Sequence, residues 1–233
     1  MKPSKKTLNK KHTTPAEKGG FVLSEDTPFV IKEAYKSLRT NVMFSMPGTE
    51  CKCVGVTSAS PGEGKSTTAA NLAVSLAQIG KRVLLIDCDM RIPTVANRFH
   101  LQAAPGLSDF LAGQAKVEET VRRLDTYNLN VMPSGNIPPD PTGLLEARQL
   151  EHLFAAFRKI YEYVVIDLPP VTVVSDAVIL SKYVDGYVLV AKEHVSEHRA
   201  VSEMLRQLQL ADARILGFVT NCSDVGGKPK YRR

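Results

Sequence analysis

The chain has 233 residues, of which 43% are hydrophobic and 23% charged, and its net charge is +6. This composition is typical of a globular protein with a sizeable core and excludes a mainly disordered or fibrous chain. No apolar run approaches the roughly 18 residues needed to cross a bilayer, and the lysine-rich N-terminus lacks an apolar signal core. We therefore expect a cytoplasmic protein.

The positive charge is concentrated at the two ends of the chain. Residues 1–20 hold six lysines and one glutamate, and residues 228–233 hold two lysines and two arginines. The main expectation is a disordered basic arm over 1–24 and a flexible tail over 223–233, and the alternative is attraction to anionic lipid or an acidic partner. Nucleic-acid binding is not expected, since stacking aromatics are nearly absent among these charges. Residues 25–222 remain as a single domain.

The first regular element predicted along the chain is a helix over residues 28–46. Apolar side chains recur there at helical spacing with charged residues between them, and Pro47-Gly48 ends the pattern.

Residues 54–68, VGVTSASPGEGKSTT, predict a buried strand, a phosphate-binding loop and the opening of a helix. Glycines in the loop let backbone N–H groups approach phosphates, and the helix N-terminus adds its dipole. Lys65 would reach the β- and γ-phosphates, Ser66 would bind Mg²⁺, and Thr67 would lie near the α-phosphate. The predicted nucleotide-binding residues in this loop are Ser60, Pro61, Gly62, Glu63, Gly64, Lys65, Ser66 and Thr67.

This loop departs from the usual phosphate-loop pattern at its first position. Ala59 stands where the pattern has glycine, and Ser60 stands where partition ATPases carry a second signature lysine. The alternative interpretation is a plain turn between a strand and a helix that happens to end in Gly-Lys-Ser.

The remaining elements alternate between strands and helices. Four apolar residues at 83–86 predict a strand covered on both faces. Further strands are predicted at 129–132, 163–167, 186–191 and 214–220, with helical segments at 65–79, 95–100, 107–112, 117–124, 142–157, 175–183 and 197–210. Such alternation predicts an α/β fold of the P-loop NTPase type, with a mostly parallel twisted sheet and helices on both faces.

Acidic residues follow two of these buried strands, where ligands bind in an open α/β sheet. Asp167 fits the position of a Walker B acid that holds Mg²⁺ directly or through water. Asp87 and Asp89 lie one residue apart on extended chain and point the same way, so one could support Mg²⁺ while the other accepts a proton from a hydroxyl. The alternatives are a strand-end cap for Asp167 and turn hydrogen bonds for the pair.

These segments together resemble the bacterial tyrosine kinases. Residues 60–66, residues 83–91 as an apolar run plus DxDxR, and residues 164–170, VVIDLPP, look like Walker A, A′ and B of that family. Residues 33–41, EAYKSLRTN, are similar to its ExxRxxRTN oligomerisation helix, with Lys36 in place of the first arginine. The closest resemblance is to the free-standing cytoplasmic kinase of capsular or exopolysaccharide assembly.

The resemblance covers about residues 28–222 and implies a deviant-Walker kinase that uses ATP and Mg²⁺ to phosphorylate protein tyrosine. Lys65 would stabilise the phosphates, and Asp89, or alternatively Asp87, would orient or deprotonate the acceptor. The implied metal ligands are Ser66, Asp87 and Asp167. Asn221 would contact adenine.

The family also implies partners. These are a membrane activator, or polysaccharide co-polymerase, whose cytoplasmic tail completes the kinase, further copies in a ring held by Glu33, Lys36 and Arg39, a tyrosine phosphatase and protein substrates. The activator would place the chain at the inner face of the plasma membrane. The family's terminal tyrosine cluster is reduced here to Tyr231, as a candidate phosphate acceptor, and Lys36 cannot reproduce the bidentate pairing of arginine.

Two other functions remain open from the sequence. The first is a partition or positioning ATPase that acts as an ATP-switched dimer on DNA or membrane, although Ser60 counts against it. The second is a catalytically weak, ATP-binding regulator of polysaccharide assembly, which the poor tyrosine tail favours.

Overall fold

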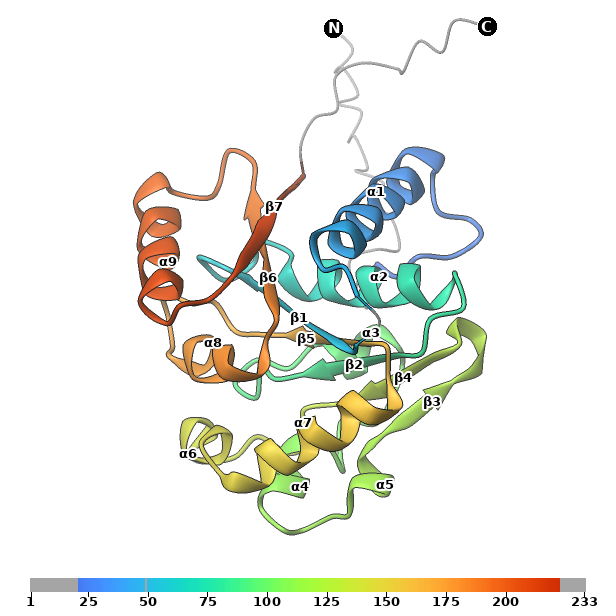
Figure 1. The fold of residues 1–233 in the computed structure, drawn as a ribbon, viewed down its shortest axis with the longest axis vertical. Helices are drawn as coiled ribbons and strands as arrows, with labels where there is room; N and C mark the ends of the chain where they lie inside the picture. The colour runs from blue at the N-terminus through green and yellow to red at the C-terminus, as the bar shows by residue number, and fades with distance from the viewer. Residues whose placement is uncertain (1–20, 49, 223–233) are drawn as a thin grey trace, which may run out of the picture.

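The computed structural model describes residues 21–48 and 50–222. Seven strands form one sheet in the order β3-β4-β2-β5-β1-β6-β7 (Figure 1). Every neighbouring pair is parallel except β3 and β4, which are antiparallel. The predicted α/β fold with a mostly parallel sheet is therefore confirmed.

The element bounds agree with most of the predicted ranges to within a few residues. The strands are β1 (Lys52–Ser58), β2 (Val83–Asp87), β3 (Arg122–Leu124), β4 (Leu129–Met132), β5 (Tyr163–Asp167), β6 (Gly186–Lys192) and β7 (Ile215–Asn221). The helices are α1 (Phe29–Ser45), α2 (Lys65–Ala77), α3 (Val95–Arg98), α4 (Leu107–Leu111), α5 (Val117–Thr120), α6 (Pro141–Leu145), α7 (Arg148–Ile160), α8 (Asp176–Ile179) and α9 (His198–Leu210), with 3₁₀ turns η2 (Asp125–Tyr127) and η3 (Leu180–Tyr183).

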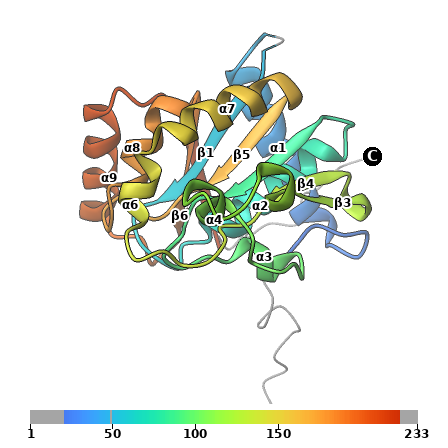
Figure 2. The same cartoon turned by 90° about the horizontal axis from the view of Figure 1, so that it is seen from below.

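Helices cover both faces of the sheet, because successive side chains of a strand point to opposite faces. On β2, Leu84 and Ile86 belong to the core beneath α7, whereas Val83 and Leu85 belong to the core beneath α2. Helices α1 and α2 therefore lie on one side, and α6, α7 and α9 on the other (Figures 1 and 2). This double coverage explains why the central strands are continuous apolar runs.

The boundary predicted for the N-terminal arm is wrong at its inner end. Leu23 is only 4% exposed, and its N–H donates to Asn71 Oδ1 at 2.7 Å. Asn71 Nδ2 donates in turn to the Phe21 carbonyl at 3.2 Å. Residues 21–24 thus belong to the fold, whereas the rest of the predicted arm, residues 1–20, and the predicted tail, 223–233, lie outside the described residues.

Two predicted helical ranges are each divided in the structure. Residues 117–124 form α5 and then the edge strand β3, in which Arg122 is paired with Val131 of β4. The helix predicted over 142–157 is interrupted at Ala147, whose φ of −65° and ψ of 140° are extended. Neither break carries a Gly or Pro signal in the sequence, so packing against the rest of the fold decides both.

Helix α1, the predicted oligomerisation helix, is fastened to α2 within the chain. Arg39 Nη1 donates to the Ser75 carbonyl at 2.8 Å and to Ser75 Oγ at 3.3 Å. Lys36 and Glu33 instead form an exposed ion pair of 2.8 Å on α1 itself. The role of these three charged residues in assembly stays a prediction.

We expect Arg39→Ala to lower the free energy of unfolding by about 1–2 kcal/mol, because it removes a charged donor from a partly buried carbonyl. Urea denaturation monitored by circular dichroism would measure the loss. Lys36→Ala on the same helix is the matched control and should change stability by less than about 0.5 kcal/mol. Equal losses in the two variants would contradict the clamping role of Arg39.

Within residues 21–48 and 50–222, no helix combines the length and apolar character that crossing a bilayer requires.

Candidate functional site

The loop between β1 and α2 adopts a conformation that its glycines allow. Gly62 and Gly64 have φ of 78° and 98°, a region that side chains with a Cβ disfavour. Ala59, by contrast, is not among the residues with positive φ, so the missing glycine of the usual pattern is not required there. Glu63 braces the loop from inside, since its buried Oε2 accepts the N–H of Ser60 at 2.9 Å.

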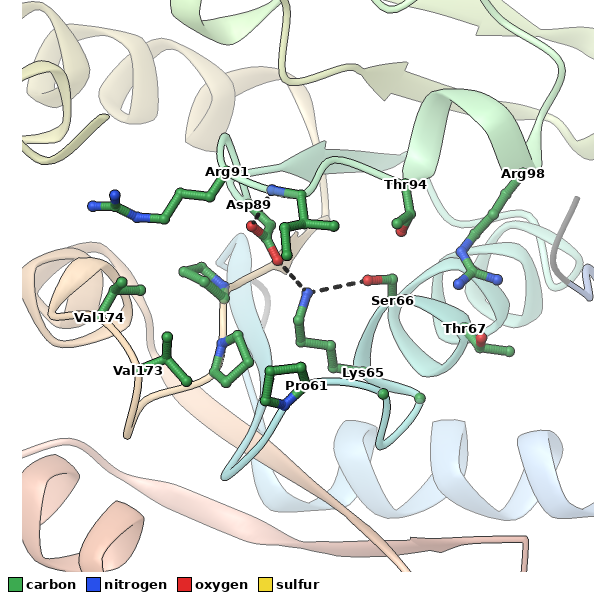
Figure 3. Close-up of a pocket in the computed structure, with 15 residues that line it drawn as sticks. Pro61, Lys65, Ser66, Thr67, Asp89, Arg91, Thr94, Arg98, Val173 and Val174 are labelled. Carbon is green, nitrogen blue, oxygen red and sulfur yellow. Dashed lines mark hydrogen bonds and ion pairs between the residues drawn. The ribbon is translucent and has the colours of Figure 1, made fainter. Parts of the chain in front are cut away.

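This loop forms one wall of a cavity of about 310 Å³, and the segments that follow β2 and β5 form the others (Figure 3). Six of the predicted nucleotide-binding residues line it, namely Pro61, Gly62, Gly64, Lys65, Ser66 and Thr67. Ser60 and Glu63 do not line the cavity and instead hydrogen-bond to each other inside the loop.

Lys65 lies between two carboxylates on the floor of the cavity. Its Nζ is 2.7 Å from Asp89 Oδ2 and 3.6 Å from Asp167 Oδ1. Burial opposes its charge, but the nearby Asp167 and Asp89 outweigh burial and raise the pKa of Lys65. The side chain is therefore a fixed, buried ammonium group that points into the cavity.

Asp167 is completely buried, and neither of its oxygens has a hydrogen-bond partner within the described part of the chain. Burial also raises its pKa. Such an unsatisfied carboxylate, near the Ser66 hydroxyl, has the chemistry of an Mg²⁺ site. Among the described residues no three acidic, His or Cys side chains cluster to hold a metal by themselves.

The two acids that follow β2 have different surroundings. Asp87 Oδ1 accepts the N–H of Asp89 at 3.1 Å, and Oδ2 accepts the N–H groups of Thr94 and Val95 at 3.1 and 3.0 Å. Burial and the neighbouring Asp167 raise the pKa of Asp87 to about 8. These contacts are the turn hydrogen bonds considered as the alternative for this pair, and the metal role of Asp87 stays a prediction.

Asp89 is the acid of this pair that lines the cavity. Its Oδ2 contacts Lys65, and its Oδ1 accepts the N–H of Ile92 at 3.0 Å. Ile92 N–H fixes the carboxylate in position while one edge remains directed at the cavity (Figure 3).

Asn221 lies beside the loop and does not line the cavity. Its Nδ2 donates to the carbonyl of Glu63 at 3.1 Å. A Cβ added at Gly64 would come within 1.9 Å of the same nitrogen. Its predicted contact with adenine stays a prediction, and Tyr231 lies outside the described residues.

Sequence reasoning missed two polar residues of this cavity, Thr94 and Arg98. Arg91 Nε is 3.2 Å from Asp176 Oδ2, which neutralises it, whereas Thr94 and Arg98 bring unpaired polar atoms to the wall. Arg91 is the arginine of the DxDxR motif, whose place after a strand predicts that it faces the phosphate loop, and it does line the cavity. No signal in the sequence distinguishes Thr94 or Arg98 from surface residues of a short helix.

We expect Asp167→Asn to stabilise the ligand-free chain by about 1–3 kcal/mol, because it removes an unsatisfied buried carboxylate. Since its pKa is raised on folding, the folded chain retains a proton that the unfolded chain releases above pH about 4. The gain should therefore be small near pH 4 and grow as the pH rises. Thermal unfolding at several pH values would measure it.

Asp176→Asn is the matched control for this substitution. Asp176 is equally buried but is paired with Arg91, and its Oδ1 accepts the Thr142 hydroxyl at 2.9 Å. Its loss should lower stability. A decrease in both variants would contradict the view that the missing hydrogen bonds of Asp167 cost stability.

Comparison with known proteins gives consistent matches. Residues 51–215 match the AAA domain family. Tyrosine-protein kinase YwqD of Bacillus subtilis is 39% identical over 199 residues, which cover 85% of this chain and 84% of that protein.

Two solved structures are similar over most of the chain. The chimerical protein CapA2B2 superposes with a TM-score of 0.78 at 35% identity, covering 84% of this chain and 85% of that one. The kinase domain of the Escherichia coli tyrosine kinase ETK gives a TM-score of 0.81 at 29% identity and covers 91% and 86% of the two chains. The extent of these matches, together with the loop, the acids and the sheet, shows that the chain belongs to the family of bacterial tyrosine-protein kinases.

Proposed function

We propose that the chain is an ATP-dependent protein-tyrosine kinase that transfers the γ-phosphoryl group of ATP to tyrosine hydroxyls, its own included. The observation that supports this most directly is the placement of Lys65 between Asp89 and Asp167 in the cavity behind the phosphate-type loop. One ammonium group and two carboxylates at the ends of neighbouring strands supply a phosphate ligand, a metal ligand and a proton acceptor.

Each group has a separate task in this proposal. Lys65 binds the β- and γ-phosphate oxygens, and the backbone N–H groups near Gly62 and Gly64 cradle the same phosphates. Ser66 and Asp167 hold Mg²⁺, with Asp87 as a further supporting acid. The metal neutralises the charge that develops on the transferred phosphoryl group.

We assign to Asp89 the role of the base that accepts the proton of the acceptor tyrosine. Asp89 Oδ2 accepts a hydrogen bond from Lys65 Nζ at 2.7 Å. When phosphate oxygens bind the ammonium group of Lys65, Asp89 Oδ2 no longer pairs with it. This oxygen can then accept a hydrogen bond from the phenol of the acceptor tyrosine, followed by its proton. The ion pair thus holds the base in place until the nucleotide enters.

We further propose that this kinase acts in capsular or exopolysaccharide synthesis and export. Its relatives carry the names of tyrosine-protein kinases, and CapA2B2 is described as a chimera. In this proposal a membrane activator supplies a cytoplasmic tail that completes the kinase at the inner face of the plasma membrane. Copies of the chain associate through α1, a tyrosine phosphatase reverses the modification, and Tyr231 is the candidate acceptor.

The direct test is to incubate the purified chain, alone and with the cytoplasmic tail of its activator, with ATP and Mg²⁺. Phosphotyrosine detected by antibody and mass spectrometry is the expected result. Absence of phosphotyrosine from the chain and from added protein substrates, under conditions where ATP binds, would contradict the proposal. ATP-dependent dimers whose hydrolysis responds to DNA or lipid would instead favour a positioning ATPase.

A further inference from the structure

Two polar side chains of the short helix α3 bring unused hydrogen-bonding atoms to the cavity. Thr94 Oγ1 and the Nε and Nη1 atoms of Arg98 are buried, yet none has a hydrogen-bond partner among residues 21–48 and 50–222. Both residues line the same cavity as Lys65 and Ser66. Buried polar groups are nearly always paired in folded proteins, so two such groups on one wall require an explanation.

The hydroxyl of Thr94 does not make the hydrogen bond that is usual at its position. A threonine just before a helix normally uses its hydroxyl to accept a backbone N–H of the first turn. Here the Asp87 carboxylate accepts the N–H groups of Thr94 and Val95, which precede those that a cap hydroxyl accepts. The Thr94 side chain makes no capping hydrogen bond, so its hydroxyl is available to a ligand.

The guanidinium group of Arg98 is partly buried, and its buried Nε and Nη1 have no hydrogen-bond partner in the described part of the chain. Burial lowers its pKa, while the more distant carboxylates of Asp167 and Asp87 oppose that change. By contrast, Arg91, at the other end of the cavity, forms an ion pair with Asp176. Removing a guanidinium from water without pairing it is costly, so an anion that enters the cavity would be bound strongly there.

The direction of the side chain indicates which part of a ligand it would meet. In Figure 3 the Arg98 side chain extends from α3 back toward the first turn of α2, near Thr67, while Lys65 points to the opposite side of Ser66. An elongated polyphosphate lying along the N-terminus of α2 would therefore have Lys65 at one end and Arg98 at the other.

We propose that Arg98, assisted by the Thr94 hydroxyl, binds the α- and β-phosphates, the part of the nucleotide that ATP and ADP share. This inference rests on the proposed nucleotide site and adds a second cation to it. Lys65 interacts with the reacting end of the polyphosphate, and Arg98 holds the end that does not react. One polyphosphate would then contact both Lys65 and Arg98, and it would give the unpaired guanidinium atoms of Arg98 their acceptors.

The test is to compare the nucleotide affinity and the thermal stability of the full-length Arg98→Met variant with those of the full-length wild type. Met is apolar and of similar length, so it removes the charge without leaving a large cavity. The dissociation constants of ADP and ATP, measured by calorimetry, should each rise by about tenfold or more and by the same factor. Thr94→Val should raise both by roughly two- to tenfold.

The melting temperature provides a second measurement, whose expected result would differ if Arg98 had a purely structural role. Without nucleotide, Arg98→Met should melt at a higher temperature than wild type, because a cation whose buried Nε and Nη1 have no hydrogen-bond partner among the described residues has been removed. Saturating ADP should raise its melting temperature less than that of wild type. Arg148→Ala is the control for lost charge, since Arg148 is exposed at the start of α7 and should leave both quantities unchanged.

Three results would overturn the inference. They are ADP affinity within twofold of wild type in a folded Arg98→Met variant, a loss confined to ATP, and a lower melting temperature together with an undiminished response to ADP. Failure of the wild type itself to bind either nucleotide would instead contradict the proposed function. Arg98→Lys should recover part of the affinity, because it restores the charge without the planar donors.

Discussion

Replacing Lys65 with methionine should reduce the rate of phosphotyrosine formation by about a thousandfold. The ammonium group is buried, fixed by Asp89 and Asp167, and points into the cavity. Its loss removes the positive charge that, in our proposal, stabilises the transferred phosphoryl group. The loss also leaves two buried carboxylates facing an anionic ligand. Nucleotide affinity should therefore fall as well, and single-turnover transfer from radiolabelled ATP would measure the rate.

Lys81→Met is the matched control for this variant. Lys81 follows the far end of α2 and forms a partly exposed ion pair of 2.9 Å with Glu162. Its replacement should leave phosphotyrosine formation within about twofold of wild type. If Lys65→Met kept more than a tenth of the wild-type rate, Lys65 would not be the phosphate ligand and the proposed mechanism would have to be abandoned.

Asp89→Asn should separate phosphoryl transfer from nucleotide binding. The amide keeps the size of the carboxylate and its hydrogen bond from Ile92 N–H, but it cannot accept the phenol proton. General base catalysis contributes about 10²–10⁴-fold, so kcat should fall by that factor. The affinity for ADP should stay within a few fold of wild type, because Lys65 still has Asp167 beside it.

Asp125→Asn is the corresponding control, since Asp125 is exposed and its ion pair with Arg123 lies at the surface. It should leave kcat unchanged. Normal kcat in Asp89→Asn would transfer the role of base to Asp87, the alternative that the sequence left open. A large loss of ADP affinity in Asp89→Asn would show that the carboxylate organises the site and does not serve as the base.

The phosphate loop and the two strand-end acids could be predicted because their signals are local. Four buried residues followed by an acid describe Asp87 and Asp167 equally well, and the loop is marked by its glycines and by the Gly-Lys-Ser that follows a strand. Strand pairing then brings Asp87 and Asp167 side by side, since they are register partners in β2 and β5. The sequence therefore predicted that the loop and these acids lie together, but it did not predict the role of each acid.

Features that depend on packing were not predictable in the same way. Asp87 supports α3 because residues 94 and 95 fold back onto it, and this long turn has no sequence signature. Strand β3 has three residues, of which two are arginines, and it forms only because β4 offers a free edge. Arg98 lies in a helix of four residues, which is too short for its periodicity to show that Arg98 lines the cavity.

The contact between Asn221 and Glu63 makes the outer strand of the sheet part of the loop's support. β7 is an edge strand that pairs with β6. Its last residue, Asn221, places its side chain where a Cβ on Gly64 would lie. Any ligand that rigidifies the loop must then also slow the opening of that edge, and fraying of the edge must loosen the loop by the same coupling free energy. Hydrogen exchange of the β7 amide protons should therefore report whether a ligand occupies the loop, although β7 does not line the cavity.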